Sequence, residues 1–266
     1  MPKTKAKGAT PRTATAIPEP EPAPSPAPQA SPNGSRPAAL VTGASRGIGR
    51  ATCLRLARDG YDIIALARNE AELEALGIEI AQIGRKCRLI ALDLAHPPAI
   101  AATLYGVHVD VLVNNAGMAV SKPFTELAPD EWHRMIDVNV NALYHVTRAV
   151  LPGMIERGHG HVCTIGSIAG RSAFIGGSCY SGTKAFVTAW SESLMLEVRD
   201  RGVKVSVVMP GGVATEFGGT QPTLADAWKL AAADVADAVS YVVGTPDSVL
   251  VHRLEVRTLN APPARR

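Results

Sequence analysis

Residues 39–49 read ALVTGASRGIG, a short apolar run followed by glycines in the spacing Gly-x-x-x-Gly-x-Gly. The apolar run predicts a buried strand, and residues 47–59 have the pattern of a helix. In such a unit we expect Gly43 to allow a sharp turn, Gly47 to let the backbone approach a pyrophosphate, and Gly49 to let helix and strand pack closely. The stretch therefore predicts a dinucleotide site, with a merely flexible glycine turn as the alternative.

Strand-like and helix-like segments alternate from Ala38 onward. We expect strands at residues 39–42, 62–67, 88–93, 109–114, 161–166, 203–209 and 254–257. We expect helices at residues 47–59, 71–83, 129–157, 180–201 and 234–243. This alternation is typical of βαβ units, so the sequence predicts an α/β fold, a Rossmann-like doubly wound parallel sheet, in a single domain over residues 38–266.

Residues 1–37 differ in composition from the rest of the chain. They contain ten of the 20 prolines, interspersed with Ala, Glu and Ser. Such a segment cannot bury enough apolar surface to offset the entropy lost on ordering, so we expect a disordered Pro/Ala-rich tail. The charged side chains of this tail sum to the chain's formal charge of +3, which leaves residues 38–266 neutral. A neutral body gives no electrostatic reason to bind nucleic acid or an anionic membrane.

The remaining composition points to a cytoplasmic protein that needs no metal. No apolar run reaches the roughly 18 residues that span a bilayer, and no apolar core of a secretory signal is present. The four cysteines have no pairwise spacing typical of a metal or redox site: they are Cys53, Cys87, Cys163 and Cys179. We expect them to be reduced and mostly buried.

Four landmarks follow the glycine turn in order. NNAG at residues 114–117 follows the fourth predicted strand, Ser167 follows the fifth, YSGTK at residues 180–184 opens a helix, and PGGVAT at residues 210–215 follows the sixth strand. With the glycine turn, they resemble the short-chain dehydrogenase/reductase superfamily in its ordinary-length branch, over residues 38–260. The resemblance implies an oxidoreductase that uses a nicotinamide cofactor and interconverts a secondary alcohol or hydroxy acid and its carbonyl by hydride transfer.

Tyr180 and Lys184 lie four residues apart on one predicted helix, so their side chains share a face. A nearby ammonium favours the phenolate, which suits a general acid and base. The resemblance implies that Tyr180 exchanges a proton with the substrate oxygen and that Lys184 also binds the nicotinamide ribose. It further implies that Ser167 hydrogen-bonds the carbonyl oxygen and that Asn139 bends its helix and holds a water for a proton relay. Taken singly, these residues also fit a turn serine, a helix-start aromatic, a solvated base and a buried amide.

The resemblance also implies a larger set of cofactor-binding residues. They are Gly43, Ser45, Arg46, Gly47, Ile48, Gly49, Arg68, Asp93, Asn115, Ala116, Gly117, Tyr180, Lys184, Pro210, Gly211, Val213 and Thr215. Within this set, Asp93 at the end of the third predicted strand resembles the family's adenine-contacting acid, with a strand-ending or helix-capping Asp as the alternative. Asn114 is expected to tie neighbouring strands through its amide.

The end of the second predicted strand indicates which nicotinamide cofactor binds. Sheets that bind NAD usually place an Asp or Glu there to accept hydrogen bonds from the ribose, but this chain has Ala67. Arg68 follows it, and Arg46 lies in the glycine turn. Two guanidinium groups near one ribose favour a 2′-phosphate, so the sequence predicts NADP(H), with Arg68 as an ordinary surface base as the alternative.

The expected substrate pocket is mostly apolar, and its walls are Met118, Ile168, Phe174, Cys179 and Phe217. Arg171 is the one candidate to bind a substrate carboxylate, with an exposed surface arginine as the alternative. Residues 234–238 and 253–257 resemble the branch that contains 3-hydroxy acid, serine and related small-alcohol dehydrogenases, but the substrate and the direction of reaction stay open. A catalytically silent NADP(H)-binding redox sensor and a sugar-nucleotide epimerase of the extended branch are the alternatives.

The two longest predicted helices carry more apolar residues than one sheet face needs. Examples are Met135, Val146, Val150, Ala185, Trp190 and Leu194. Because these helices pair subunits in the family that the chain resembles, we expect a homodimer or homotetramer.

Overall fold

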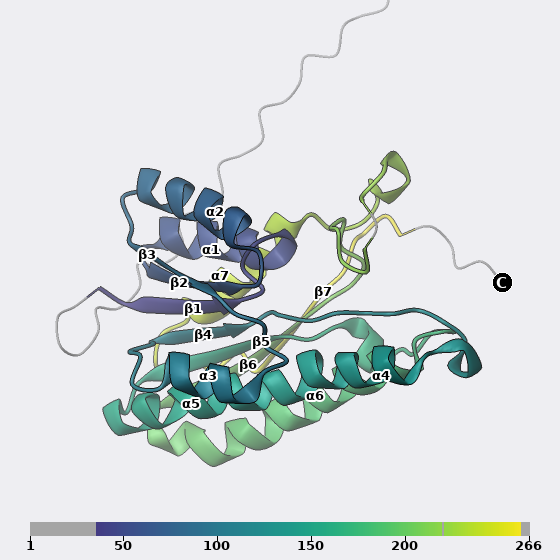
Figure 1. The fold of residues 1–266 in the computed structure, drawn as a ribbon. Helices are drawn as coiled ribbons and strands as arrows, with labels where there is room; N and C mark the ends of the chain where they lie inside the picture. The colour runs from purple at the N-terminus through teal and green to yellow at the C-terminus, as the bar shows by residue number, and fades with distance from the viewer. Residues whose placement is uncertain (1–35, 220, 262–266) are drawn as a thin grey trace, which may run out of the picture.

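The computed structural model describes residues 36–219 and 221–261, and in this part of the chain seven parallel strands form one sheet in the order β3-β2-β1-β4-β5-β6-β7 (Figure 1). The strands are β1 (Ala38–Thr42), β2 (Asp62–Ala67), β3 (Cys87–Ala91), β4 (Val111–Asn114), β5 (Gly160–Ile165), β6 (Val203–Pro210) and β7 (Arg253–Val256). Along the chain, β2 and β3 are added on one side of β1, and β4 to β7 are then added on its other side. This reversal is the mark of a doubly wound sheet.

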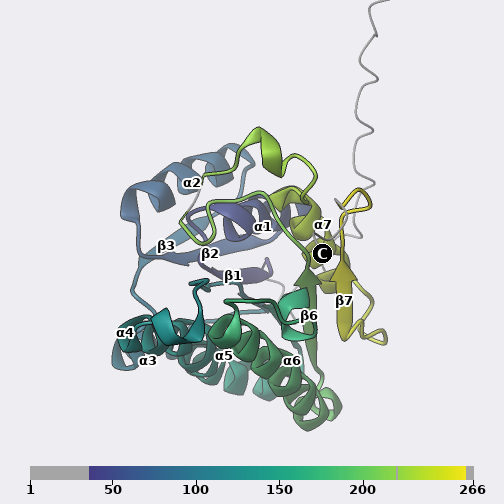
Figure 2. The ribbon, with the colours of Figure 1, turned by 90° about the vertical axis from the view of Figure 1, so that its right-hand side faces the viewer.

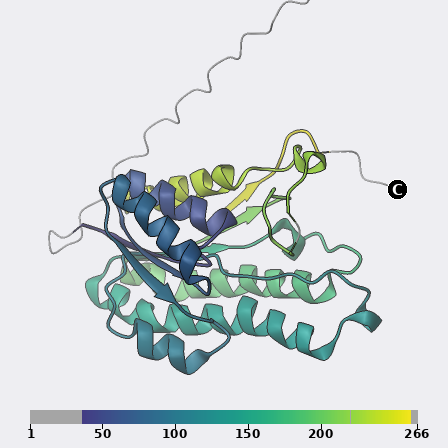
Figure 3. The same cartoon turned by 45° about the horizontal axis from the view of Figure 1, so that its top comes forward.

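Helices cover both faces of the sheet (Figures 1 and 3). One face carries α1 (Gly47–Asp59), α2 (Glu70–Gln82) and α7 (Ala232–Val243), and the other carries α3 (Pro97–Leu104), α5 (Ala142–Arg157) and α6 (Ser178–Val198). The helix α4 (Pro129–Ile136) leads into α5 through a π-helical turn at Asp137–Asn141. Short 3-10 turns lie at Phe124–Glu126, Ile168–Gly170, Arg199–Arg201 and Leu224–Asp226.

The alternation of side chains along each strand fills two separate cores. In β1, Ala39 and Val41 pack with α1, α2 and α7, whereas Leu40 packs with α3, α5 and α6. A parallel sheet that is covered by helices on both faces needs apolar side chains on both faces. Its strands therefore appear in the sequence as continuous apolar runs. Burial of a leucine such as Leu40 stabilises the fold by about 1.5–3 kcal/mol.

The predicted parallel sheet is confirmed, with α1 and β2 at the predicted bounds. The structure adds α3, which the sequence analysis missed because this helix is short and begins with two prolines. It also splits the predicted helix at residues 129–157 at the π-helical turn. The third strand ends at Ala91, so Asp93 follows the strand and does not end it. The predicted tail lies outside the described residues except for Arg36 and Pro37.

Candidate active site

A cleft of about 1440 Å³ runs along the edge of the sheet where the parallel strands end. Its walls come mainly from the segments that follow the strands β1 to β6. Figure 2 faces this edge, with the segment between β6 and α7 projecting toward the viewer. Open α/β sheets bind their ligands where the strand order reverses, which is between β1 and β4 here. The cleft is therefore the candidate active site.

The glycine turn after β1 forms one end of the cleft. Gly43 and Gly47 have φ angles of 65° and 54°, in the left-handed region that other residues rarely adopt. A Cβ on Gly49 would lie 2.2 Å from the Gly43 carbonyl oxygen, so α1 packs directly on the turn. A Cβ on Gly47 would lie 3.4 Å from the Thr215 side chain, so the glycine turn meets the loop after β6.

Asn115 and Thr42 hold the ends of β4 and β1 together. The Asn115 amide nitrogen donates to the carbonyl oxygens of Thr42 and Gly43 at 2.9 and 3.2 Å. The Thr42 hydroxyl accepts the backbone N–H groups of Asn115 and Ala116, both at 3.0 Å. Asn114 instead donates to the hydroxyl of Thr147 on α5 at 3.0 Å, so the expectation that Asn114 ties neighbouring strands is wrong. Thr42 was not predicted, because its only signal in the sequence is a hydroxyl at the end of a buried apolar strand.

The structure brings Ser167, Tyr180 and Lys184 together in the cleft. Burial raises the pKa of Tyr180 above its ordinary value and outweighs a hydrogen bond with Ser167, which lowers it. The Lys184 ammonium lies 5.9 Å from the centre of the Tyr180 ring and donates to the carbonyl oxygen of Ile165 at 2.8 Å. Burial lowers the pKa of Lys184 to about 8. Ser167 also accepts the N–H of Ala169 at 3.1 Å, which fixes its hydroxyl at the start of a 3-10 turn.

Asn139 lies inside the π-helical turn and joins three segments of the chain. Its amide oxygen accepts the N–H of Met118 at 2.8 Å, and its amide nitrogen donates to the Met118 carbonyl at 2.9 Å and to the Thr183 hydroxyl at 3.1 Å. A Cβ on Gly117 would lie 3.4 Å from the Asn139 oxygen and 3.8 Å from the Lys184 nitrogen. π-helical turns are rare and often occur at functional sites. This turn places the amide next to helix α6, which carries Tyr180 and Lys184.

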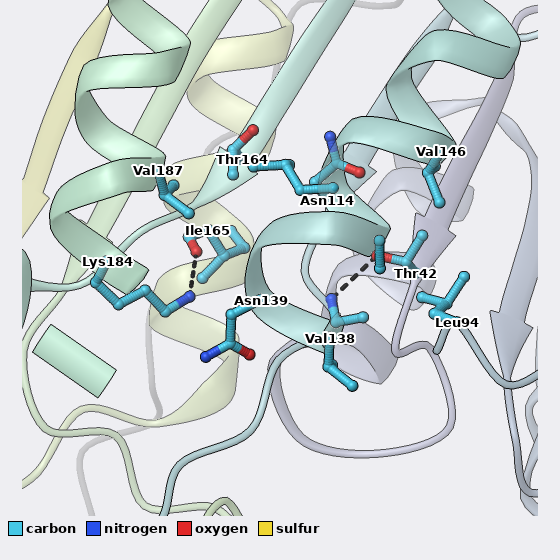
Figure 4. A pocket seen from close by; sticks show the side chains of 13 residues that line it. Thr42, Leu94, Asn114, Val138, Asn139, Val146, Thr164, Ile165, Lys184 and Val187 are labelled. Carbon is cyan, nitrogen blue, oxygen red and sulfur yellow. Dashed lines mark hydrogen bonds between the residues drawn. The ribbon is translucent and has the colours of Figure 1, made fainter. Parts of the chain in front are cut away.

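A small cavity of about 10 Å³ lies behind Lys184 and Asn139 (Figure 4). The Thr164 hydroxyl lines it and is buried, with no hydrogen-bond partner among the described residues. A cavity of this volume has room for about one water molecule, and its walls combine apolar side chains with polar ones such as Asn139 and Thr164. The inner side of the candidate site is therefore small and partly polar.

The end of the cleft next to β2 has exposed, positively charged side chains. Ala67 is buried at the end of β2, and the exposed side chains of Arg46 and Arg68 line the cleft. Burial acts to raise the pKa of Asp93, but a hydrogen bond from Arg134 at 2.7 Å, the N–H of Ala95 and the charges of Arg134 and Arg68 together lower it. The sequence analysis did not select Arg134, because nothing in the pattern of α4 distinguishes it from an ordinary surface base.

These residues fit a dinucleotide that carries a 2′-phosphate. The turn offers left-handed glycines and the first N–H groups of α1, with Ser45 and Ile48 in the cleft wall. No acid at position 67 opposes a phosphate, and two guanidinium groups are exposed. At the other end of the cleft, residues 210–215 line the wall beside Tyr180 and Lys184. Within the part of the chain that the structure describes, no three His, Cys, Asp or Glu residues group as metal ligands.

The substrate half of the cleft is lined by Met118, Ile168, Phe174 and Phe217, as predicted. The ring centre of Tyr180 lies 6.5 Å from that of Phe174 and 5.9 Å from that of Phe217. Two expectations are wrong. Cys179 does not line the cleft, because it is buried with its thiol toward the carbonyl oxygen of Trp132. Arg171 lies outside the cleft, where it forms an ion pair with Glu255 at 3.4 Å.

Comparisons with known proteins agree with this geometry. The family profile of short chain dehydrogenases matches residues 37–223. The NADP-dependent 3-hydroxy acid dehydrogenase of Escherichia coli K12 is 36% identical over 233 residues, which cover 82% of this chain and 93% of that enzyme. The serine 3-dehydrogenase of Rhizobium radiobacter is 33% identical over 236 residues, which cover 83% of this chain and 93% of that enzyme.

Solved structures are similar over the same part of the chain. An alcohol dehydrogenase from Thermococcus sibiricus in complex with 5-hydroxy-NADP matches with a TM-score of 0.79 at 31% identity, over 86% of this chain and 99% of that one. The closed form of a serine dehydrogenase in complex with NADP+ matches with a TM-score of 0.77 at 34% identity, over 86% of this chain and 98% of that one.

Proposed function

The chain belongs to the short-chain dehydrogenase family, and from this premise we propose that it is an NADP(H)-dependent oxidoreductase that interconverts a secondary alcohol or hydroxy acid and its carbonyl. The observation that carries this proposal is the meeting of Ser167, Tyr180 and Lys184 in one cleft. The same cleft has Ala67 where an acid would oppose a 2′-phosphate, followed by the exposed Arg68. A silent redox sensor would not require these three side chains.

The cofactor would lie along the whole cleft. Arg46 and Arg68 would hold the 2′-phosphate, and the glycine turn with the start of α1 would hold the pyrophosphate. Asp93, Asn115, Ala116 and Gly117 would line the adenosine side, and residues 210–215 with Tyr180 and Lys184 would line the nicotinamide side. When bound, the nicotinamide supplies a hydride to the carbonyl carbon or accepts one from the alcohol.

Tyr180 would give its phenolic proton to the carbonyl oxygen during reduction and take it back during oxidation. Ser167, which is already hydrogen-bonded to the phenol, would donate to the same oxygen as negative charge develops on it. With a pKa of about 8, Lys184 is mostly an ammonium at neutral pH, and its charge favours the phenolate that burial opposes. Asn139 would fix the segment at Met118 relative to helix α6, because its amide hydrogen-bonds both Met118 and Thr183.

We further propose a homodimer or homotetramer in the cytoplasm. The outer faces of α5 and α6 expose Tyr144, Phe186 and Leu196, an arrangement that suits pairing of these helices between subunits. All four cysteines lie within the described residues and are free, which is usual for a protein of a reducing compartment. No helix in the described part of the chain is long and apolar enough to cross a membrane.

The test is a cofactor-consumption screen. Purified protein is mixed with NADPH or NADH and with ketones, aldehydes, β-keto acids and quinones, and loss of the reduced cofactor is followed. We expect turnover with NADPH on at least one carbonyl class. Tight NADPH binding without turnover on any class would instead support the redox-sensor alternative.

A further inference from the structure

We propose that Arg134 is a positioning residue that sets the choice between NADPH and NADH. It pairs with the Asp93 carboxylate, which would otherwise pair with Arg68, and so leaves Arg68 free to bind a 2′-phosphate. This inference rests on the proposed function and adds to its cofactor site a residue that acts through Asp93, without contact to the phosphate.

Asp93 and Arg68 leave the sheet side by side. Ala67, the last residue of β2, pairs with Ala91, the last residue of β3, so the segments that continue from this pair lie next to each other. Both Arg68 and Asp93 line the cleft. Burial acts to raise the pKa of Asp93, but the hydrogen bond from Arg134 and the charges of Arg134 and Arg68 are among the causes that lower it. The Asp93 carboxylate therefore interacts with the charge of Arg68.

A carboxylate in this position competes with a 2′-phosphate. Both groups are anions that accept charge-assisted hydrogen bonds from a guanidinium. NAD-binding sheets oppose the phosphate with an acid at the end of the second strand, where this chain has Ala67. Asp93 brings an acid to the same region from the segment after the neighbouring strand. Without a cation of its own, this acid would occupy Arg68 and repel the phosphate.

Arg134 supplies that cation from a separate element. It lies in the last turn of α4, and its Nη2 donates to Oδ2 of Asp93 at 2.7 Å. The Ala95 N–H donates to Oδ1 of the same carboxylate at 3.0 Å. Both carboxylate oxygens therefore have a donor, while the exposed Arg68 side chain stays in the cleft wall. The side chains of Arg134 and Asp93 are 34% and 31% exposed, so water screens their attraction only in part.

Two other roles of this ion pair give different results when its members are replaced. If Arg134 binds the phosphate directly, removing the charge of Asp93 does not compensate for its loss. If the pair only ties α4 to the segment after β3, breaking it lowers the melting temperature and weakens NADPH and NADH alike. Only competition for Arg68 makes the loss of Arg134 specific to NADPH and reversible by neutralising Asp93.

The experiment measures the dissociation constants of NADPH and NADH by fluorescence titration, without substrate. The readout is the ratio of the NADH constant to the NADPH constant, because contacts that both cofactors make cancel in it. We expect Arg134→Met to lower this ratio about tenfold by weakening NADPH, which is the lower value for one charge-assisted hydrogen bond. Arg134→Met with Asp93→Asn should return to within about twofold of the wild-type ratio.

An unchanged ratio in Arg134→Met would overturn the proposal. So would a double variant whose ratio stays as low as that of Arg134→Met, because Arg134 would then act on the phosphate without Asp93. Circular dichroism and thermal unfolding check that each variant is folded. Arg134→Gln keeps an amide donor but removes the charge, so it should lower the ratio as well and gives the same test if the methionine variant is unstable.

Two variants serve as matched controls. Arg58→Met makes the same chemical change at an exposed arginine of α1 outside the cleft and should leave the ratio unchanged. Glu72→Gln neutralises another acid of the cleft wall, in the first turn of α2. It should change the ratio equally in the wild type and in Arg134→Met, because Glu72 is not the partner of Arg134. A rescue of Arg134→Met by Glu72→Gln as large as that by Asp93→Asn would overturn the role of Asp93.

The wild-type protein separates this inference from the proposed function. Binding of neither cofactor, or no turnover on any carbonyl class, contradicts the proposed function. A wild type that prefers NADH contradicts phosphate recognition by Arg68 and overturns this inference with it. A wild type that prefers NADPH and reduces a carbonyl, while Arg134→Met and Arg134→Gln keep the wild-type ratio, overturns the role of Arg134 alone.

Discussion

Tyr180 is held between opposing influences on its pKa. Burial raises the pKa and the Ser167 hydrogen bond lowers it, while the ammonium of Lys184 lies 5.9 Å from the ring centre. A phenol that is poised in this way can act as an acid in one direction of reaction and as a base in the other. Because oxidation of the alcohol needs the phenolate and reduction needs the phenol, we expect oxidation to speed up and reduction to slow down as the pH rises.

Replacing Tyr180 by Phe should remove turnover and leave binding intact. The variant loses the transferable proton but keeps the ring between Phe174 and Phe217. We expect kcat to fall roughly a hundred- to ten-thousandfold, with an NADPH dissociation constant and a melting temperature close to those of the wild type. Steady-state kinetics, fluorescence titration and thermal unfolding provide the three measurements. Near-normal turnover in this variant would contradict the mechanism.

We expect the buried charge of Lys184 to lower the free energy of unfolding at neutral pH. The difference between its ordinary pKa of 10.5 and the value of about 8 in the folded protein corresponds to about 3 kcal/mol of unfavourable burial of charge. Lys184→Met removes this cost but leaves the Ile165 carbonyl without its partner, a loss of about 1 kcal/mol. We therefore expect a gain of about 2 kcal/mol in the free energy of unfolding at pH 7, together with loss of turnover.

The pH dependence of that gain checks its cause. The folded pKa is lowered, so the unfolded chain binds more protons than the folded one between pH 8 and 10.5, and wild-type stability rises in that window. The advantage of Lys184→Met should be full below pH 8 and shrink toward pH 10.5. Denaturant unfolding at several pH values measures it. A constant advantage would indicate improved packing and not relief of a buried charge.

Arg68 should determine the choice between NADPH and NADH. Its guanidinium lines the cleft directly after Ala67 and shares this region with Arg46. Arg68→Ala should cost about 1.5–3 kcal/mol of NADPH binding, roughly ten- to a hundredfold, and hardly affect NADH. Adding Ala67→Asp should invert the preference by supplying a ribose acceptor and a repulsive charge.

Dissociation constants for both cofactors provide the readout for Arg68. The control is Arg58→Ala, because Arg58 is exposed at the last turn of α1 and does not line the cleft. Equal weakening of NADPH and NADH by Arg68→Ala, or a wild type that prefers NADH, would show that this loop does not recognise the phosphate.

At the scale of elements, the sequence predicted the strands and helices that have a regular local pattern of apolar residues. The apolar runs and helical periodicity located the seven strands to within about two residues, and Gly43 and Gly49 provide the sharp turn and the close packing that were expected of them. The pattern failed where a helix is short or irregular. The helix α3 has only eight residues and starts with prolines, and the π-helical turn at Asp137–Asn141 contains no glycine or proline that would mark a break between the helices on either side of it.

In the candidate site too, some features could be predicted from the sequence and others could not. Residues next to strand ends, such as Ser167, could be located because the parallel sheet gathers its carboxyl ends at one edge. Contacts between distant segments could not be predicted. These contacts depend on how the helices and loops pack against the sheet. Examples are the ion pair of Arg134 with Asp93, the hydrogen bonds of Thr42 to the turn after β4, and the orientation of Cys179 toward Trp132. Such side-chain partners leave no periodic signal in the sequence.

At the scale of the whole molecule, the structure revises which residues could pair subunits. Met135, Val146, Val150 and Leu194 are buried in the chain's own core. Tyr144 on α5 and Phe186 and Leu196 on α6 are instead 51%, 42% and 56% exposed. Figures 1 and 3 show α5 and α6 side by side on one face of the sheet. Association across this face would remove all three side chains from water.

We therefore expect light scattering at micromolar concentration to give the mass of two or four chains. The variant with Phe186→Glu and Leu196→Glu should give the mass of one chain, because two carboxylates in an apolar interface lose hydration without gaining partners. The control is Ile78→Glu, since Ile78 is 62% exposed on α2, which covers the opposite face of the sheet. It should leave the mass unchanged, and circular dichroism should show that both variants stay folded. A wild type with the mass of one chain, or dissociation caused equally by Ile78→Glu, would show that α5 and α6 do not pair subunits.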